Sequence, residues 1–373
     1  MTGLIVSTYP GDEITLFGNL VCSRNSVNWS AALVDPDPSK SMSTEQAVGL
    51  WKSSCRRMNI TPWNVFHFNS IPTERLEAKA LEEFPRIDLT QFDLVVIPNI
   101  LDPSPLRRLV AAGVSLNCET VWMETNIGGK GEFSSVTPEN WGKLAAIVNE
   151  CYGPRLRDSQ IAIEDMRGCR QYRQMRGSDV IRFYLQFLSL NTSVVDDANP
   201  WDLLTSQYEA DRYALELEAL SSIEWLSLLE CGACVGAFTG QIVSRFPDRI
   251  VSACESNPQF ARRLDEQLGN KVTVYLQDVE HVSCNCDVLF ASSILYYCSS
   301  IPESVISCPK KYLVVSHIKT YHDKTLSPFM ERLGWRQVFK SELYPRIEDF
   351  CGIPVVKDGT EVAIWQKPDS IQP

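Results

Sequence analysis

The segment Leu228–Thr239 (LLECGACVGAFT) constrains the fold more than any other part of the chain. An apolar run ends at Glu230, turns through Gly232 and Gly236, and continues into residues with a helical pattern. Glycines at such a turn let a nucleotide-like ligand approach the backbone, and the helix that follows points its free N–H groups at that ligand. We therefore expect a strand, a ligand-binding turn and a helix, as in an α/β fold with a doubly wound sheet.

Three further apolar runs follow the glycine turn, and two of them end in an acidic residue. Glu255 ends the first of these runs, nineteen residues after Gly236. A carboxylate at this spacing commonly accepts hydrogen bonds from ribose hydroxyls. Asp278 ends the next run, and we expect it to accept a hydrogen bond from an adenine amino group, although Asp also favours ordinary turns. Together these strand ends predict an adenosine pocket at one edge of the sheet.

The order of these motifs resembles class I S-adenosylmethionine-dependent methyltransferases, and in detail the nodulation-protein-S-like group. The matching segments are Tyr208–Tyr213 (YEADRY), the loop at 229–239 and Leu295–Tyr297 (LYY), within a likeness that runs from Trp201 to Lys367. The resemblance implies a seven-stranded methyltransferase sheet and S-adenosyl-L-methionine as the cofactor. The cofactor-binding residues that we predict are Glu230, Gly232, Gly236, Glu255, Asp278, Tyr208, Arg212 and Tyr213. The last three form either a lid over the methionine part of the cofactor or a helix packed on the core.

Two positions depart from the pattern of that group. Cys234 stands where the middle glycine of the turn is expected, and Ser293 stands where a glutamate is expected after the fourth strand. Cysteine is small enough for the turn if its φ stays negative, so we expect cofactor binding to survive. The missing glutamate bears on the chemistry rather than on binding.

The candidate catalytic residues are His317, Tyr296 and Tyr297. His317 follows the apolar run Tyr312–Ser316 and is expected at the carboxyl edge of the sheet. A hydroxyl acceptor usually needs a base near it, which His317 could supply, whereas an amine needs only to arrive deprotonated. His322 is a poorer candidate base. Tyr296 and Tyr297 are expected to wall the acceptor pocket, with simple packing as the alternative.

The N-terminal half carries a second α/β pattern. Strand-like runs at 3–8, 29–34, 65–68, 92–98 and 119–123 alternate with helical patterns at 43–58, 74–84, 106–112 and 138–151. Such alternation predicts a mostly parallel sheet covered on both faces. The fold class is therefore α/β, with two Rossmann-like three-layer domains. We place them at residues 1–188 and 201–373, joined by a polar, turn-rich linker at 189–200.

The end of the first strand resembles a degenerate form of the PIG-L/LmbE-type zinc-dependent sugar N-deacetylases. The segment Ser7–Glu13 (STYPGDE) matches the first motif of that family, and a later match includes Leu106 and Arg107. The resemblance places Tyr9 at a zinc-ligand position and Gly11 at the position of the general base. Leu106 and Arg107 replace the later aspartate and histidine, so Asp12 alone remains. A catalytic zinc takes three protein ligands and a water. We therefore expect neither a catalytic metal nor deacetylation.

Composition narrows the class of protein. The chain has 373 residues, 44% hydrophobic and 22% charged, typical of a globular protein. A net charge of −11 argues against a nucleic-acid partner, which would need a basic stripe. No apolar run is long enough to span a membrane, and no signal peptide is evident, so thirteen cysteines predict a reducing cytoplasm.

The sequence therefore predicts a cytoplasmic S-adenosylmethionine-dependent methyltransferase fused to an inactive deacetylase-like domain. Both resemblances point to a sugar, an amino sugar or a glycan precursor as the acceptor, methylated on nitrogen or oxygen. One alternative is a non-catalytic binding or scaffold protein. Another is a methyltransferase that acts on a secondary metabolite or a protein.

Overall fold

The computed structural model describes residues 1–35, 43–66, 73–102, 104–125, 132–134, 138–152, 170–189 and 195–368. The chain divides into two compact units, Met1–Thr192 and Ser193–Pro373, each of which is described by itself. The division falls within the predicted linker at 189–200, of which residues 190–194 lie outside the described ranges.

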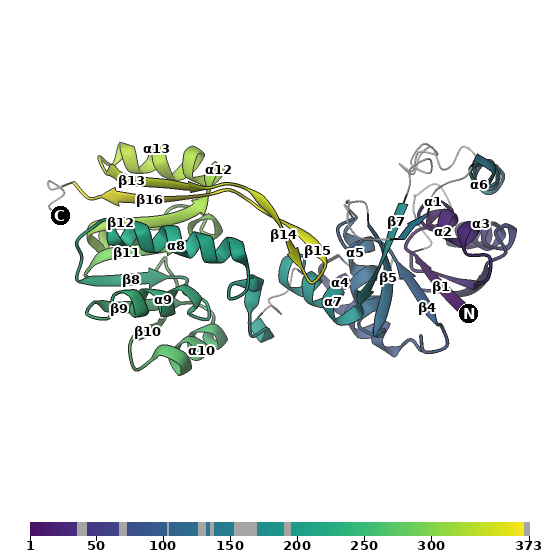
Figure 1. The fold of residues 1–373 in the computed structure, drawn as a ribbon, viewed down its shortest axis with the longest axis horizontal. Coiled ribbons are helices and arrows are strands. Elements are labelled where there is room, and N and C mark those ends of the chain that lie inside the picture. The colour runs from purple at the N-terminus through teal and green to yellow at the C-terminus, as the bar shows by residue number, and fades with distance from the viewer. Residues whose placement is uncertain are drawn as a thin grey trace. The chain divides into compact units, whose positions relative to one another are not determined.

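The first unit alternates strands and helices along the chain (Figure 1). Its strands are β1 (Thr2–Ser7), β2 (Asn28–Leu33), β3 (Thr61–Val65), β4 (Leu94–Ile97), β5 (Thr120–Thr125), β6 (Glu132–Ser134) and β7 (Arg170–Arg176). Its helical segments are α1 (Asp12–Thr15), α2 (Gly18–Ser23), α3 (Thr44–Arg57), α4 (Thr73–Glu83), η1 (Phe84–Arg86), α5 (Pro105–Ser115), α6 (Pro138–Cys151) and α7 (Gly177–Phe187). Ser43 and Gln46 form a capping box that starts α3.

The seven strands of this unit form one sheet in the order β3-β2-β1-β4-β5-β7-β6. The first five strands in this order are parallel, and β7 runs antiparallel to β5 and β6. Ile5 of β1 packs in a core with Trp51 of α3 and Leu144 of α6. Its neighbours Leu4 and Val6 are also buried, and strand alternation directs them to the opposite face. A central strand covered on both faces explains why its sequence is continuously apolar.

The second unit repeats this alternation. Its strands are β8 (Ser227–Cys231), β9 (Ile250–Glu255), β10 (Thr273–Leu276), β11 (Cys286–Ser292), β12 (Pro309–Ile318), β13 (Arg336–Leu343), β14 (Arg346–Phe350), β15 (Ile353–Lys357) and β16 (Thr360–Gln366). Its helical segments are η5 (Pro200–Asp202), α8 (Gln207–Ser221), α9 (Ala237–Arg245), α10 (Pro258–Leu268), η6 (Leu295–Tyr297), α11 (Glu303–Ser307), α12 (Lys319–Tyr321), η7 (His322–Leu326) and α13 (Ser327–Arg332).

Seven of these strands form the second sheet, in the order β10-β9-β8-β11-β12-β16-β13, and β14 and β15 form a separate two-stranded sheet. Val288 and Phe290 of β11 pack in a core with residues of α8 and α9. Leu289 and Ala291 of the same strand pack in a second core with residues of α11 and α13. The alternating residues of one strand thus serve two helical layers, and Figure 1 shows α8 lying along one face of the sheet.

The predicted fold class is confirmed: both units are α/β with mostly parallel main sheets, and the main sheet of the second unit has seven strands. The first unit also has seven strands, in the same order as the second. The strand predicted at 65–68 ends earlier, because β3 occupies Thr61–Val65, and residues 67 and 68 lie outside the described ranges. Within the described ranges, no helix combines the length and the apolar composition needed to cross a bilayer.

Candidate functional site

The glycine turn connects β8 to α9 at the carboxyl edge of the second sheet. Gly232 and Gly236 have φ values of 70° and 81°, which glycine adopts without strain. A Cβ atom at Gly232 would lie 2.2 Å from Ile294, and one at Gly236 would lie 2.4 Å from Leu264. Because Gly236 is the N-cap of α9, no N-cap side chain occupies the N–H groups of the first turn. The first turn of α9 therefore presents backbone donors to this edge, whereas the N–H groups of Gly232, Ala233, Cys234 and Gly236 are already bonded to groups of the turn and of β9.

Cys234 also lies in the left-handed region, with a φ of 51°. The condition under which cysteine was expected to fit the turn, a negative φ, is therefore not met. Non-glycine residues in this region carry strain that the surrounding structure must offset. The Cys234 N–H donates to Oε2 of Glu255 at 2.9 Å, which holds the turn against the end of β9.

The two acids at the ends of β8 and β9 are both buried. Oε2 of Glu230 accepts from Oγ1 of Thr239 at 2.6 Å, and burial raises the pKa of Glu230 to about 8. Oε1 of Glu255 accepts from the Asn257 N–H at 2.8 Å. The predicted ribose ligand thus stands at its expected strand end, and both of its oxygens accept bonds from backbone N–H groups.

Asp278 lies two residues after β10 and is exposed. Its Oδ1 accepts from the Glu280 N–H at 2.9 Å, which is an ordinary turn contact. The adenine contact therefore stays a prediction.

The three predicted residues of α8 are buried rather than arranged as an exposed lid. The Tyr208 hydroxyl donates to the Asp358 carbonyl and lies 2.8 Å from Oγ1 of Thr360. The Tyr213 ring stacks on Phe238 of α9, with centroids 5.2 Å apart. Tyr208 and Tyr213 therefore pack within the second unit, as in the alternative of a helix packed on the core.

Arg212 differs, because its guanidinium reaches the end of β11. Nη1 donates to Oγ of Ser292 and lies 3.3 Å from Oε1 of Glu216, while Nη2 lies 2.7 Å from Oε2 of Glu209. Burial alone would lower the pKa of Arg212, but Glu216 and Glu209 outweigh it and the net shift is upward. A charged, buried arginine therefore links α8 to the carboxyl edge of the sheet.

The candidate catalytic residues lie together at the ends of β11 and β12. Tyr296 packs against Tyr297, with ring centroids 4.6 Å apart, and its edge faces His317 at 5.9 Å. His317 also meets the ring of Tyr321 at 5.4 Å. Tyr297 is 76% exposed, whereas His317 is fully buried. Burial lowers the pKa of His317 to about 3, helped by His322 and Arg212, so its imidazole is neutral and weakly basic.

His322 pairs with a buried carboxylate. Its Nδ1 lies 2.7 Å from Oε1 of Glu361, and these two residues with Asp323 place one donor atom each within 4.8 Å of one another. Lys340 and Lys319 lie 2.8 and 3.4 Å from Oε2 of Glu361. Two ammonium groups thus already supply the positive charge that a cation would bring, and we assign no metal here.

In the first unit, Asp12 and Arg107 meet at the ends of β1 and β4. Asp12 is fully buried, and its Oδ2 accepts from the N–H groups of Thr8 and Tyr9 at 3.0 Å. Nη2 of Arg107 lies 2.7 Å from Oδ1 of Asp12, and Nη1 lies 3.3 Å from Asp102. A guanidinium, not a set of metal ligands, therefore faces the remaining carboxylate.

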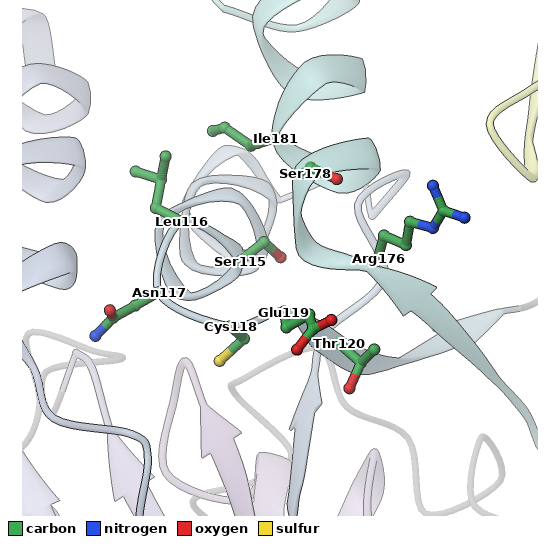
Figure 2. A pocket seen from close by; sticks show the side chains of 9 residues that line it. All are labelled: Ser115, Leu116, Asn117, Cys118, Glu119, Thr120, Arg176, Ser178 and Ile181. Carbon is green, nitrogen blue, oxygen red and sulfur yellow. The ribbon is translucent and has the colours of Figure 1, made fainter.

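A hollow of about 830 Å³ lies elsewhere in the first unit (Figure 2). It is formed where α5 ends, β5 begins and β7 leads into α7. Its lining residues are Ser115, Leu116, Asn117, Cys118, Glu119, Thr120, Arg176, Ser178 and Ile181. Thr120 is the first residue of β5, so the hollow lies at the amino end of that strand, away from the carboxyl edge that carries Asp12.

Sequence reasoning missed Glu209, Glu216 and Ser292, which complete the surroundings of Arg212. The two glutamates lie three residues before and four residues after Arg212 on α8, spacings that commonly form ion pairs. That spacing was a usable signal for the glutamates. Ser292 becomes recognisable only when β11 is placed against α8.

Comparison with known proteins shows which family part of the chain resembles. Residues 187–306 match the family model described as Nodulation protein S (NodS), about a third of the chain. The structure of the N-methyltransferase NodS from Bradyrhizobium japonicum WM9 with S-adenosyl-L-homocysteine is 16% identical, covering 47% of this chain and 95% of that one, with a TM-score of 0.39. Precorrin-6y C5,15-methyltransferase from Geobacter metallireducens GS-15 is also 16% identical, covering 46% and 95%, with a TM-score of 0.37. No curated protein sequence matches the chain.

The family match contains the glycine turn, both buried acids at the strand ends and the tyrosines of η6. The second unit is therefore similar to the nodulation protein S family over residues 187–306, and methyl transfer from S-adenosylmethionine is the activity that this similarity supports.

Proposed function

We propose that the second unit transfers a methyl group to the amine of a sugar or glycan precursor. The match of residues 187–306 to the nodulation protein S family carries this proposal. The cofactor supplies a methyl group activated on a sulfonium. The glycine turn would let its adenosine part approach, and the first turn of α9 and the Glu255 carboxylate would hold it, because backbone donors and a carboxylate acceptor are what ribose hydroxyls require.

The surroundings of His317 favour nitrogen over oxygen as the methylated atom. A hydroxyl needs a base to take its proton, and a base with a pKa of about 3 takes that proton poorly. An amine carries its own lone pair once it is neutral. In this proposal His317 is therefore a packing residue for Tyr296 and Tyr321 rather than the base.

The first unit is proposed to be an inactive deacetylase-like domain retained for binding or for its shape. Arg107 brings a fixed positive charge to Asp12, where that chemistry would need a metal and a base. A sugar-binding role for this unit would fit a sugar acceptor for the other.

Two other functions can be distinguished from the proposed one by measuring cofactor binding and methyl transfer. Ser293 in place of the expected glutamate motivates a binding or scaffold protein without turnover. A secondary metabolite or a protein as the acceptor would keep the methyltransferase chemistry and change only the partner. In both of these functions, as in the proposed one, the partner is not a nucleic acid, consistent with the net charge of −11.

The test begins with calorimetric binding of S-adenosylhomocysteine to the full chain, followed by transfer from methyl-labelled S-adenosylmethionine to glucosamine. Glu255→Ala should weaken binding by about 1–3 kcal/mol, because hydrogen bonds to a charged group are lost. Glu266→Ala, an exposed acid on α10, should bind like the wild type. Binding without transfer to any small molecule would favour the scaffold, and transfer only to proteins or nucleic acids would exclude the sugar.

A further inference from the structure

Glu216 is a buried carboxylate on α8 that the proposed cofactor site does not use. Its side chain is fully buried, and it lies between the helix and the end of β11. Oε1 accepts from Oγ of Ser292 at 2.9 Å and lies 3.3 Å from Nη1 of Arg212. One oxygen of the carboxylate is therefore fully engaged.

The other oxygen, Oε2, is buried and has no hydrogen-bond partner within residues 195–368 or elsewhere in the described chain. Leaving a buried charged acceptor unpaired is costly, because the group has given up its hydrogen bonds to water. Burial raises the pKa of Glu216, and Arg212 opposes this shift only in part. The Ser316 hydroxyl lies beside this carboxylate and can supply one donor. A carboxylate oxygen can accept two hydrogen bonds, so a ligand that brings an N–H group would supply the second.

The Glu216 carboxylate lies at the end of β11, where the glutamate expected at position 293 is absent. The nodulation-protein-S-like pattern has a glutamate at the place of Ser293, directly after β11. Here Glu216 reaches the neighbouring Ser292 from α8, while Nη1 of Arg212 lies 3.5 Å from Oγ of Ser293. Ser292 and Ser293 are half-buried, so this edge opens toward solvent.

The charges around the site come from two carboxylates and two cations. Glu209 and Glu216 flank Arg212, and Lys357 lies 3.1 Å from Glu209. Burial and the nearby Glu216 raise the pKa of Glu230 to about 8, so this third carboxyl is largely protonated at neutral pH. Glu216 is therefore the carboxylate at this edge with a buried oxygen still able to accept a hydrogen bond.

We propose that Glu216 binds the ammonium group of the acceptor and takes its proton, in place of a glutamate at position 293. This inference rests on the proposed amine acceptor. A proton moves from the ammonium nitrogen to Oε2, and the electrons of the N–H bond remain on nitrogen as a lone pair. Glu216 becomes a neutral carboxylic acid, and the acceptor becomes a neutral amine able to accept the methyl group.

Glu216→Gln is the first test, with Glu218→Gln, an exposed acid on the same helix, as the matched control. We expect Glu216→Gln to leave S-adenosylhomocysteine affinity within about threefold and to lower methyl transfer to glucosamine by about 100-fold. The control should match the wild type. Adding Ser293→Glu to Glu216→Gln should restore most of the rate, because the carboxylate returns to the same edge from β11.

A second measurement needs no variant and separates this inference from the proposed function. In the wild type loaded with S-adenosylhomocysteine, glucosamine should bind at least about tenfold more tightly than N-acetylglucosamine, which has no ammonium. This difference in affinity is expected even if no methyl transfer occurs. The absence of transfer would count against the proposed function and not against the role of Glu216. Equal affinity for the two sugars, unchanged turnover in Glu216→Gln, or a tenfold loss of S-adenosylhomocysteine affinity in that variant would overturn the role of Glu216.

Discussion

Glu13, in the core of the first unit, shows how a single buried carboxyl can couple folding to pH. It is fully buried and accepts hydrogen bonds from the Gly11 N–H at 2.8 Å and from the hydroxyls of Ser54 and Tyr152. Burial raises the pKa of Glu13 to about 7, against an ordinary value of 4.5, although these hydrogen bonds oppose the shift. The folded chain therefore holds this proton more tightly than the unfolded chain does.

The stability that this proton contributes is fully present below pH 4.5 and is lost as the pH rises through 7. A shift of this size corresponds to about 3 kcal/mol in the free energy of unfolding. Denaturant unfolding of the full chain across pH 4.5–8 should show this loss in the wild type and not in Glu13→Gln. The same slope in both proteins would mean that Glu13 is not the responsible group.

At the scale of elements, the β14–β15 hairpin fixes the start of α8. Glu348 of β14 accepts from the Tyr208 N–H in the first turn of the helix and from the hydroxyl of Ser206, its N-cap. Arg346 lies 2.6 Å from Asp211, one turn further along. The helix that carries Arg212 and Glu216 is thus held by a strand pair about 140 residues later in the chain.

Glu348→Ala should destabilise the second unit by about 1–3 kcal/mol, because a carboxylate that accepts from a backbone N–H and from the N-cap hydroxyl at a helix N-terminus is lost. Thermal unfolding followed by calorimetry would measure this change. Glu331→Ala removes an acid from an exposed hydrogen bond with Ser327 on α13 and serves as the control. If both substitutions lowered the stability equally, the contact between Glu348 and the start of α8 would not account for the loss.

Strands buried on both faces could be predicted from the sequence more easily than polar strands. Strands such as β8 and β11 are continuous apolar runs, because helices cover both of their faces, and their sequences predict them. β7 was missed because five of its seven residues are Arg or Gln, with Tyr172 and Met175 as its buried apolar residues. Glu216 could not be placed from sequence, since its role depends on Ser292, 76 residues away, which only the folded sheet brings near.

At the scale of the whole molecule, the chain joins two sheets of the same strand order, each with its own core. Each unit therefore buries its own apolar surface. A fragment of residues 193–373 should fold and bind S-adenosylhomocysteine with an affinity within about threefold of the full chain, since a threefold change is less than 1 kcal/mol. Circular dichroism and calorimetry on the purified fragment would test this. An unfolded fragment would mean that the first unit is required for the second to form.

The ion pair between Asp12 and Arg107 limits how this chain can evolve. Replacing Arg107 alone leaves the fully buried Asp12 without its ionic partner, at a cost of about 3–5 kcal/mol, whereas replacing Asp12 leaves Arg107 beside Asp102. A lineage that replaces Arg107 first therefore passes through a poorly folded ancestor. A metal at this edge would also require new ligands at positions such as Tyr9 and Leu106. Selection for stability alone therefore tends to keep Arg107, and with it a positive charge where a metal would have to lie.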